Sequence, residues 1–214
     1  MKSVLILGSG EFGSTIAKRM SELKCDVLVI DSDEERINEI IPYVTNAMIG
    51  DCTSRDLLES IGVSDFDICV VAVGGLFQTS LEATCTLKEL GAKFVMARAT
   101  NDVQMKFLKM VGADEIAYPE KQTAIRFATR YASDMILDFI SLDNTYSIYE
   151  MRIPGAWVGR TLAQLDIRKK FDLNIITVKR EDHVFIPKPE TQFGATDVAF
   201  IIGNIKDLQK CFKL

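Results

Sequence analysis

A glycine-rich turn near the start of this 214-residue chain comes with the flanking strands and helix that a nucleotide-binding turn needs. Apolar residues 3–7 lead into Gly8-Ser9-Gly10-Glu11-Phe12-Gly13, residues 14–23 have a helical pattern, and a second apolar run ends at Asp31. This order of strand, glycine turn, helix, strand and acid is typical of dinucleotide-binding folds. A tight turn can also use glycine for structural reasons alone. With both strands and the acid present, the pattern favours a nucleotide site.

Each residue of this pattern has a physical role in binding a nucleotide. Gly8 allows the tight turn, Gly10 lets the backbone approach a pyrophosphate, and Gly13 lets the helix pack on the strand. The N–H groups and the positive dipole end of the helix attract phosphate. Asp31 can accept hydrogen bonds from both ribose hydroxyls and repels a 2′-phosphate. The sequence therefore predicts AMP, ADP, ATP or NAD(H) as the ligand, and argues against NADP.

Short apolar runs and amphipathic segments continue to alternate as far as residue 118. Strands are predicted at residues 46–51, 67–73, 93–97 and 115–118, and helices at residues 32–41, 56–61, 79–90 and 103–111. This alternation predicts an α/β fold, a Rossmann-like doubly wound parallel sheet with helices on both faces. Ligands of such folds bind outside the carboxyl ends of the strands. The candidates at these ends are Gly8 to Gly13, Asp31, Asp51, Gly74 and Arg98.

Residues 121–140 form a longer stretch with a helical pattern. Its apolar stripe consists of Ile125, Ala128, Ala132, Met135, Ile136 and Phe139. Such a helix either covers the sheet or crosses to a partner subunit. Beyond it, strands are predicted at residues 146–153, 174–179, 183–186 and 198–202, and helices at residues 161–171 and 205–212. The predicted domains are a nucleotide-binding Rossmann domain, residues 1–142, and a small α+β domain, residues 143–214.

Composition and charge argue against several classes of protein. A net charge of −5 gives no reason to expect the basic face that binds nucleic acid. The five cysteines form no CxxC pair, and with a single histidine, His183, a zinc site is hard to build. These features fit a reducing cytoplasm. Because no signal sequence and no apolar run of about 20 residues is evident, we expect a soluble protein, for which a membrane protein can still be a partner.

Several residue runs together carry a more specific resemblance, which covers nearly the whole chain. They are Gly8-Ser9-Gly10-Glu11-Phe12-Gly13, Val29-Ile30-Asp31, Ile49-Gly50-Asp51-Cys52-Thr53, Val111-Gly112-Ala113-Asp114, Tyr118-Pro119-Glu120 and Leu165-Asp166-Ile167-Arg168. On these runs the chain resembles the KtrA and TrkA regulatory subunits of bacterial potassium uptake systems. Members of this family consist of an RCK N-terminal Rossmann domain and an RCK C-terminal domain.

The resemblance implies a ligand-gated regulatory protein, not an enzyme. RCK domains form homodimers, and the dimers assemble into an octameric ring under an integral membrane potassium channel subunit of the KtrB or TrkH type. The ring changes shape when nucleotide binds. The implied location is the cytoplasm, at the inner face of the cell membrane through the partner.

The resemblance also implies roles for individual residues. The glycine turn would face the phosphates, Asp31 the ribose, and Asp51 with Cys52 the adenine edge. Glu120 matches an acidic position near the phosphates that can help to hold a divalent or sodium ion; alternatively it is a carboxylate favoured by a helix N-terminus. The full set of predicted binding residues is Gly8, Ser9, Gly10, Glu11, Phe12, Gly13, Asp31, Ser32, Asp51, Cys52, Thr53, Val73, Gly74, Arg98 and Glu120.

Glu11 departs from the family pattern, because KtrA proteins that bind ATP often carry an arginine there. Compared with a cation at this position, a carboxylate makes the interaction with a polyphosphate less favourable by several kcal/mol. AMP, ADP or NAD(H) is therefore favoured over ATP, unless a cation bridges Glu11 to the phosphates. Arg98 is the nearest candidate for a compensating positive charge; its alternative role is a solvated arginine at a strand end.

A second ligand site is implied for the second domain, which binds cyclic di-AMP at the dimer interface in some family members. The residues at comparable positions are Asp166, Arg168, Ile175, Ile176 and the loop from Pro187 to Pro189. An apolar patch with one arginine is also an ordinary dimer contact. Both interpretations stay open on the sequence.

Two other functions use the same fold. An NAD(H)-dependent oxidoreductase needs a general acid or base beside the nicotinamide, whereas the sole histidine, His183, lies in a hairpin of the small domain. A redox sensor could use the nucleotide crevice together with Cys52, although such a cysteine is more often a small buried hydrophobe. The sequence favours the regulatory subunit over both.

Overall fold

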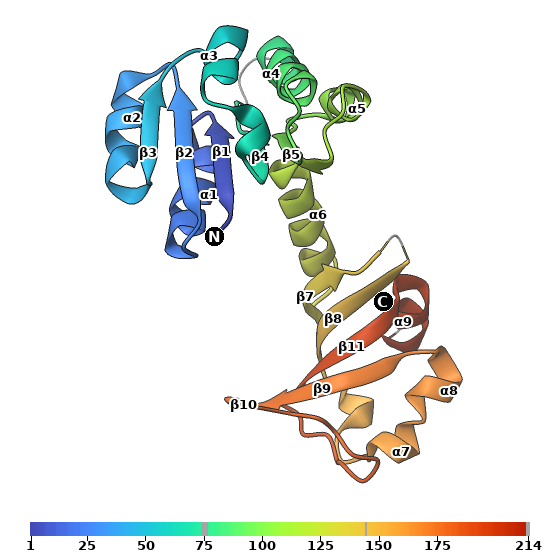
Figure 1. Ribbon diagram of the computed structural model, residues 1–214. Helices are drawn as coiled ribbons and strands as arrows, with labels where there is room; N and C mark the ends of the chain where they lie inside the picture. The colour runs from blue at the N-terminus through green and yellow to red at the C-terminus, as the bar shows by residue number, and fades with distance from the viewer. Residues whose placement is uncertain (74–76, 144, 213–214) are drawn as a thin grey trace. The chain divides into compact units, whose positions relative to one another are not determined.

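The computed structural model describes residues 1–73, 77–143 and 145–212, and its contacts divide the chain into two compact units. The first unit is Met1–Glu120 and the second is Lys121–Leu214. Figure 1 shows a sheet in each of them. Among the described residues, no helix has the length and apolar composition needed to cross a membrane.

The first unit is built on a six-stranded sheet with the order β3-β2-β1-β4-β5-β6, and all of its pairings are parallel. Its strands are β1 (Ser3–Leu7), β2 (Asp26–Asp31), β3 (Asn46–Ile49), β4 (Ile68–Val71), β5 (Val95–Arg98) and β6 (Glu115–Ala117). Its helices are α1 (Glu11–Glu22), α2 (Glu34–Ile40), α3 (Arg55–Ser60), α4 (Phe77–Glu89) and α5 (Asp102–Met110). The order reverses between β1 and β4, which creates the switch point where such folds bind ligands.

Successive side chains of the central strands are buried on opposite faces of this sheet. Val4 and Ile6 pack in a cluster with residues of α1 and α2, such as Ala17 and Ile37. Leu5 and Leu7 pack in another cluster, whose helical members include Leu58, Leu87 and Leu108 of α3, α4 and α5. Because both faces are covered, the central strands consist almost entirely of apolar residues, as in residues 4–7 and 68–71. The predicted doubly wound α/β fold is confirmed.

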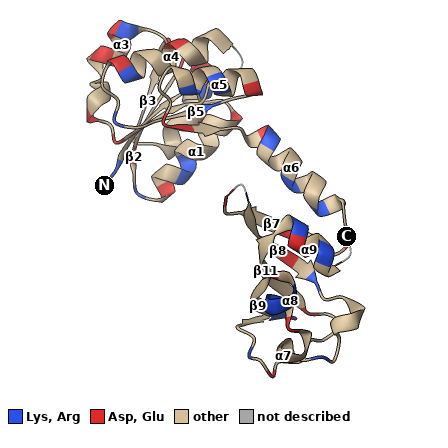
Figure 2. Cartoon of the chain, turned by 90° about the vertical axis from the view of Figure 1, so that its right-hand side faces the viewer, with Lys and Arg blue, Asp and Glu red and all other residues tan. Residues whose placement is uncertain are grey.

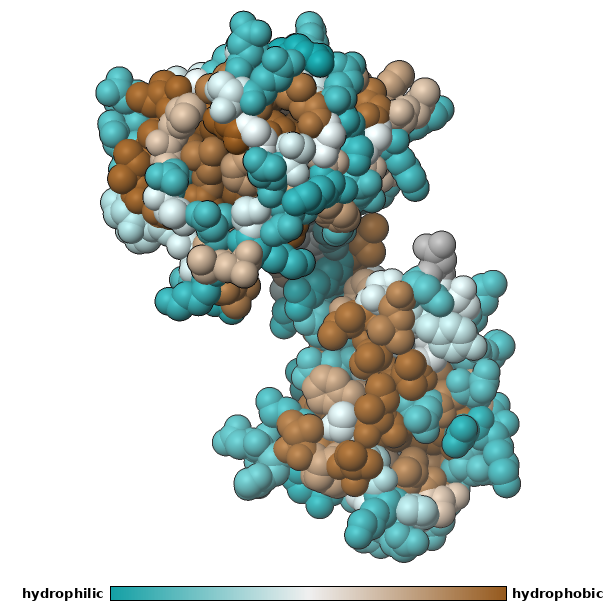
Figure 3. All heavy atoms as spheres, in the orientation of Figure 1, coloured by the Kyte–Doolittle hydropathy of each residue, from teal (hydrophilic) through white to brown (hydrophobic). Residues whose placement is uncertain are grey.

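The second unit contains a five-stranded antiparallel sheet with the order β10-β9-β11-β8-β7. Its strands are β7 (Ile136–Ser141), β8 (Tyr146–Arg152), β9 (Asn174–Arg180), β10 (His183–Phe185) and β11 (Val198–Asn204). Its shorter helices are α7 (Leu162–Leu165), α8 (Ile167–Phe171) and α9 (Ile205–Phe212). Met151, Val178, Ile201 and Leu208 form part of its core. Hydrophobic side chains also gather on the outside of this unit, over β8 and β11 (Figure 3).

The helix expected over residues 121–140 is wrong in its second half. Helix α6 spans Pro119–Tyr131, and β7 follows, with Ile136 opposite Met151 and Ile140 opposite Ile148. Pairing with β8 therefore decides the conformation of residues 136–141, whose apolar pattern also suits a helix. Lysine and arginine residues lie along α6 (Figure 2). The predicted domain limits, 1–142 and 143–214, stay a prediction.

The helix expected over residues 161–171 is also interrupted. It consists of α7 and α8, which meet at Asp166 with a left-handed φ of 47°. This conformation is tolerated by aspartate better than by most residues. The remaining predicted elements lie within a few residues of those observed.

Candidate functional site

The three glycines of the turn meet different surroundings. Gly8 has a φ of +98°, and a Cβ atom there would lie 2.9 Å from Val73 Cγ1. A Cβ atom on Gly13 would lie 1.9 Å from the carbonyl oxygen of Gly8. By contrast, a Cβ atom on Gly10 would meet nothing within 4 Å among the described residues. The fold requires glycine at positions 8 and 13, whereas at position 10 the space beside the helix N-terminus is open.

Asp31 connects the end of β2 to the glycine turn. Its Oδ2 accepts hydrogen bonds from the Ser9 N–H (2.6 Å) and the Ser9 hydroxyl (3.0 Å), and its Oδ1 accepts one from the Asp33 N–H (3.0 Å). Burial raises the pKa of this carboxyl, but the Ser9 and Asp33 hydrogen bonds and the charge of Arg36 together lower it below the ordinary 3.8. Asp31 is therefore an anion that holds the turn in shape.

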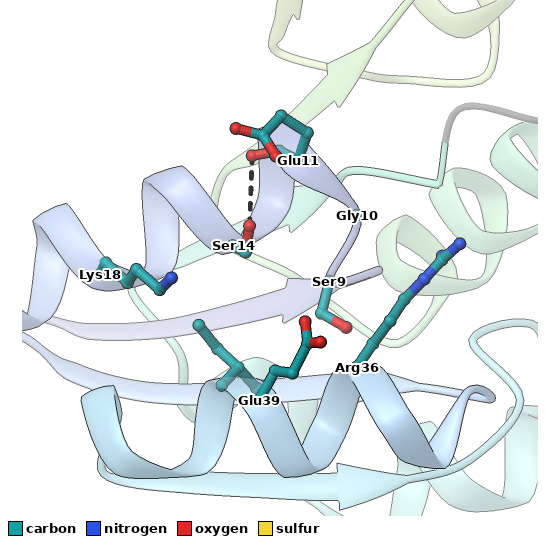
Figure 4. Close-up of a pocket in the computed structure, with 8 residues that line it drawn as sticks. Ser9, Gly10, Glu11, Ser14, Lys18, Arg36 and Glu39 are labelled. Atoms are coloured by element: carbon teal, nitrogen blue, oxygen red, sulfur yellow. Dashed lines mark hydrogen bonds between the residues drawn. The ribbon is translucent and has the colours of Figure 1, made fainter.

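A cavity of about 280 Å³ opens beside this turn, between α1 and α2 (Figure 4). Its lining residues are Ser9, Gly10, Glu11, Ser14, Lys18, Arg36, Glu39 and Ile40. Ser9, Gly10 and Glu11 are predicted site residues, and the other five were missed. The cavity is polar and carries both signs of charge, with the open face of Gly10 on its wall. This arrangement suits a ligand that combines phosphate with hydroxyl groups.

Local structure orients the charged side chains of this cavity. Asp33 caps α2 by accepting hydrogen bonds from the Glu35 and Arg36 N–H groups, and it also pairs with the Arg36 side chain at 3.4 Å. Arg36 Nη1 lies 3.9 Å from Asp31 Oδ2. Lys18 Nζ lies 4.5 Å from the centre of the Tyr43 ring. Two cations thus flank the turn from α1 and α2.

A signal in the sequence could have indicated two of the missed residues. Ser14 and Lys18 follow Gly10 at intervals of four residues, so they share one face of the helix that begins at the turn. Arg36 and Glu39 are three residues apart on α2. Their presence at the cavity depends on how α2 packs beside α1, for which periodicity gives no information.

Other predicted residues lie around the carboxyl ends of the strands but do not line this cavity. Asp51 accepts hydrogen bonds from the Thr53 N–H and hydroxyl at 2.8 and 2.7 Å, which lower its pKa. Ser32 is exposed after β2, and Val73 packs against Gly8. Gly74 lies outside the described residues. Whether these residues touch a ligand stays a prediction.

Cys52 is buried, with 5% of its surface exposed, and its Sγ donates to the Ile30 carbonyl at 3.4 Å. Burial, followed by the charges of Asp31 and Asp51, raises the pKa of this thiol to about 12. Because the thiolate is the reactive form, the structure gives Cys52 the properties of a packed hydrophobe. A buried thiol with this pKa reacts slowly with oxidants at neutral pH, which argues against redox sensing through Cys52.

We expect Cys52 to resist alkylation by iodoacetamide in the native protein at pH 8. A thiol with a pKa of about 12 is ionised in roughly one molecule in ten thousand at this pH. Cys25, which is partly exposed, serves as the internal control. Peptide mass spectrometry measures both rates. If Cys52 is labelled as fast as Cys25, the redox-sensor hypothesis returns.

Arg98 and Glu120 form an ion pair at the carboxyl end of β5. Arg98 Nη2 donates to Glu120 Oε1, and the guanidinium carbon lies 5.5 Å from the centre of the Phe12 ring. The pKa of Glu120 is lowered by a hydrogen bond from its own N–H and by Arg98. Among the described residues, no group of three or more His, Cys, Asp or Glu side chains could hold a metal ion.

The second unit has a cavity of about 260 Å³ between α7, α8 and the start of β9. Its lining residues are Leu162, Ala163, Asp166, Ile167, Arg168, Leu173, Asn174, Ile175 and Pro189. The structure thus brings together three predicted residues, Asp166, Arg168 and Ile175. Ile176 and Pro187 are not part of this lining, whereas Pro189 of the same loop is.

Comparison with known proteins gives close relatives over nearly the whole length. The chain is 35% identical over 210 residues to Ktr system potassium uptake protein C of Bacillus subtilis (strain 168), covering 98% of this chain and 95% of that protein. It is 30% identical, with the same coverage, to Ktr system potassium uptake protein A of the same organism. The protein A of Vibrio alginolyticus is 27% identical over 94% of this chain and 92% of its own length.

Solved structures share the fold at lower identity. The GsuK RCK domain superposes with a TM-score of 0.67 and 18% identity over 100% of this chain and 47% of that chain. The GsuK channel bound to NAD gives a TM-score of 0.66 and 17% identity over 98% of this chain and 38% of that chain. This chain therefore spans less than half the length of both.

Matches to two domain families agree with the similarity to these proteins. Residues 4–119 match the TrkA-N domain and residues 148–214 match the TrkA-C domain. Together with the identities to the Bacillus subtilis proteins, these matches confirm the resemblance seen in the sequence. The chain belongs to the family of Ktr and Trk potassium uptake proteins that carry a TrkA-N and a TrkA-C domain.

Proposed function

We propose that this protein is a nucleotide-binding regulatory subunit of a potassium uptake channel or transporter. The observation that carries the proposal is the contrast within the glycine turn: Gly8 and Gly13 are enclosed by the fold, whereas Gly10 faces open space beside the helix N-terminus. Packing gives no reason for glycine at position 10, and close approach of a phosphate does. Membership of the Ktr and Trk family indicates that the regulated transport system takes up potassium.

The ligand class is an adenine nucleotide, with AMP, ADP or NAD(H) favoured over ATP. Asp31 at the end of β2 supports a ribose contact, and Glu11 in the first turn of α1 opposes a chain of three phosphates. The GsuK channel has been solved with NAD and with ADP, and a Kef domain of Shewanella denitrificans with AMP. Those proteins share the fold, which is consistent with this class of ligand.

Arg98 and Glu120 extend the proposed site toward the end of β5. Arg98 supplies the positive charge that compensates for Glu11. Glu120 contributes one carboxylate to a divalent or sodium ion, with the remaining oxygens coming from the nucleotide phosphates. This ion belongs to the proposal for the bound state.

A second ligand, cyclic di-AMP, is proposed for the cavity of the second unit. Arg168 offers a guanidinium to a phosphate, and Ile175 and Pro189 of the lining offer apolar surface to a base. The competing role for this surface is a dimer contact.

The proposed partners are a second copy of this chain, an octameric ring of such dimers, and an integral membrane subunit of the KtrB or TrkH type. Exposed apolar side chains support protein contacts: Val103 and Met110 on α5, Phe127 and Tyr131 on α6, and Ile140 on β7. The proposed location is the cytoplasmic face of the membrane.

The proposed mechanism is a shift between two arrangements of the ring. A nucleotide biases the channel only by its difference in affinity for the two arrangements. Moving an equilibrium from 1:99 to 99:1 takes a difference of roughly 10⁴-fold. A nucleotide that binds but changes neither ring geometry nor potassium flux would contradict this mechanism.

Calorimetric binding of AMP, ADP, ATP, NAD, NADH and cyclic di-AMP tests the proposal. We expect AMP, ADP or NAD(H) to bind at least about tenfold more tightly than ATP, because Glu11 repels the third phosphate. Glu11→Gln should reduce this difference in affinity. Titrations in the presence of EDTA remove bridging divalent cations.

The outcome separates the two proposed sites. If none of the adenine nucleotides binds and cyclic di-AMP does, the switch lies in the second unit. If no ligand binds, the glycine turn is structural and the proposed function is wrong.

A further inference from the structure

The ion pair between Arg98 and Glu120 joins three elements around the glycine turn. Arg98 is the last residue of β5, Phe12 is in the first turn of α1, and Glu120 is in the first turn of α6. The Arg98 guanidinium contacts both the Phe12 ring and the Glu120 carboxylate. The positively charged Arg98 guanidinium thus lies beside the side chain of Phe12, in the helix turn that is proposed to bind phosphate.

Arg98 has hydrogen-bonding capacity that the protein does not use. Its Nε is buried and has no hydrogen-bond partner among the described residues. A buried N–H without an acceptor is energetically unfavourable. Arginine donates through a planar fork, which matches two oxygens of a phosphate. The guanidinium is therefore better satisfied by a second anion than by Glu120 alone.

Glu120, in contrast, can leave the pair at little cost. Its side chain is 54% exposed, against 23% for Arg98, so water can solvate the released carboxylate. The carboxylate also stays at the N-terminal end of α6, where its own N–H already bonds to it. The exposed partner is the one that moves most easily.

We propose that Glu120 is an internal competitor for Arg98: the phosphate of a bound nucleotide takes the guanidinium from Glu120 and releases the first turn of α6. This inference rests on the proposed nucleotide site and describes binding without the bridging cation, which would keep Glu120 at the phosphates. It gives binding at the turn a mechanical output, because α6 starts in the first unit and continues into the second. In the ligand-free state, the Arg98–Glu120 ion pair holds the first turn of α6 in place.

A double-mutant cycle tests the competition. Glu120→Gln should raise the affinity for AMP by roughly two- to fivefold, the value of an exposed ion pair, whereas Arg98→Gln should lower it. In the Arg98→Gln background, adding Glu120→Gln should give no gain. Titration calorimetry in EDTA and choline chloride removes the cations that could bridge Glu120 to phosphate.

The Arg98→Gln background is the control for simple charge repulsion. If Glu120 merely repels the anion, the gain from Glu120→Gln persists without Arg98, and the competition is overturned. It is also overturned if wild type binds AMP and Glu120→Gln binds it equally or more weakly. If neither wild type nor Glu120→Gln binds any adenine nucleotide, the proposed nucleotide site at the glycine turn fails together with the inference.

Hydrogen exchange gives a second, independent readout. AMP should speed amide exchange in the second turn of α6 in wild type, by releasing Glu120, because the N–H groups of that turn donate to carbonyl groups of the first. In Glu120→Gln, this exchange should already be fast without AMP and should change little when AMP is added. Slower exchange in the second turn on AMP binding to wild type would overturn the release of α6.

Discussion

Gly13→Ala should destabilise the protein by about 3 kcal/mol, at the upper end of the range for overpacked cores. The added Cβ atom would lie 1.9 Å from the Gly8 carbonyl oxygen and 3.0 Å from the Ala72 Cβ. The closest of these atoms is backbone, so no side chain can rotate away. Helix α1 would have to move off β1 and β4, which loosens the buried cluster around Val4, Ile6 and Ala17. Urea denaturation measures the change in the free energy of unfolding.

Gly10→Ala is the matched control and should show the opposite pattern. Gly10 has a φ of −60° and a ψ of 179°, which alanine adopts without strain, and its Cβ position is open. We expect the free energy of unfolding to stay within about 1 kcal/mol, because losing glycine at an N-cap and restricting the unfolded chain offset each other. Nucleotide affinity should fall at least about tenfold. A stable variant with unchanged affinity would show that phosphate does not approach Gly10.

The second large effect is expected for Asp31→Ala, which should weaken nucleotide binding by about 10- to 100-fold. Loss of charge-assisted hydrogen bonds to the ribose is worth about 1.5–3 kcal/mol. The same change also leaves the Ser9 N–H, buried beside Asp31, without its acceptor. Stability should therefore fall by about 1–3 kcal/mol as well. Calorimetry and urea denaturation on one preparation measure both effects.

Ser9→Ala separates the two roles of Asp31. It removes the hydroxyl bond to Asp31 Oδ2 but leaves the Ser9 N–H bond and the carboxylate in place. We expect its affinity for nucleotide to stay within a few-fold of wild type. If Ser9→Ala loses as much affinity as Asp31→Ala, the shape of the turn, and not the ribose contact, explains the loss.

Asp31 also makes stability depend on acid pH. Its pKa in the folded protein is below the ordinary 3.8. Its contribution is therefore fully present above pH 3.8 and is lost as the pH falls through the folded pKa. In Asp31→Ala, unfolding free energy should decline less between pH 5 and pH 3 than in wild type.

Much of the first unit could be predicted because its signals are local. The apolar runs at residues 3–7 and 67–73 are buried on both faces, so they read as strands without knowledge of their neighbours. Gly8 and Gly13 are fixed by geometry within one strand–turn–helix unit. These constraints act over a few residues, and the sequence carries them directly.

The cavity beside the turn depends on distant parts of the chain. Gly10, Ser14 and Lys18 share a helix face, but Arg36 and Glu39 reach the same cavity only because α2 packs beside α1 on the sheet. The ion pair between Arg98 and Glu120 likewise depends on tertiary structure, because it requires β6 to pair with β5 so that Ala117 lies opposite Arg98.

Sequence by itself determined the doubly wound fold, the glycine turn and the family, because glycine positions and apolar periods are properties of short segments. Only the tertiary structure decided that residues 136–141 form β7, since their apolar pattern fits helix and strand equally until β8 offers its backbone hydrogen bonds. Only it showed that Cys52 is enclosed by surrounding elements, and this burial raises the pKa of its thiol to about 12. Both results depend on contacts between segments that are far apart in the chain. The energies of such contacts cannot be inferred from a local sequence pattern.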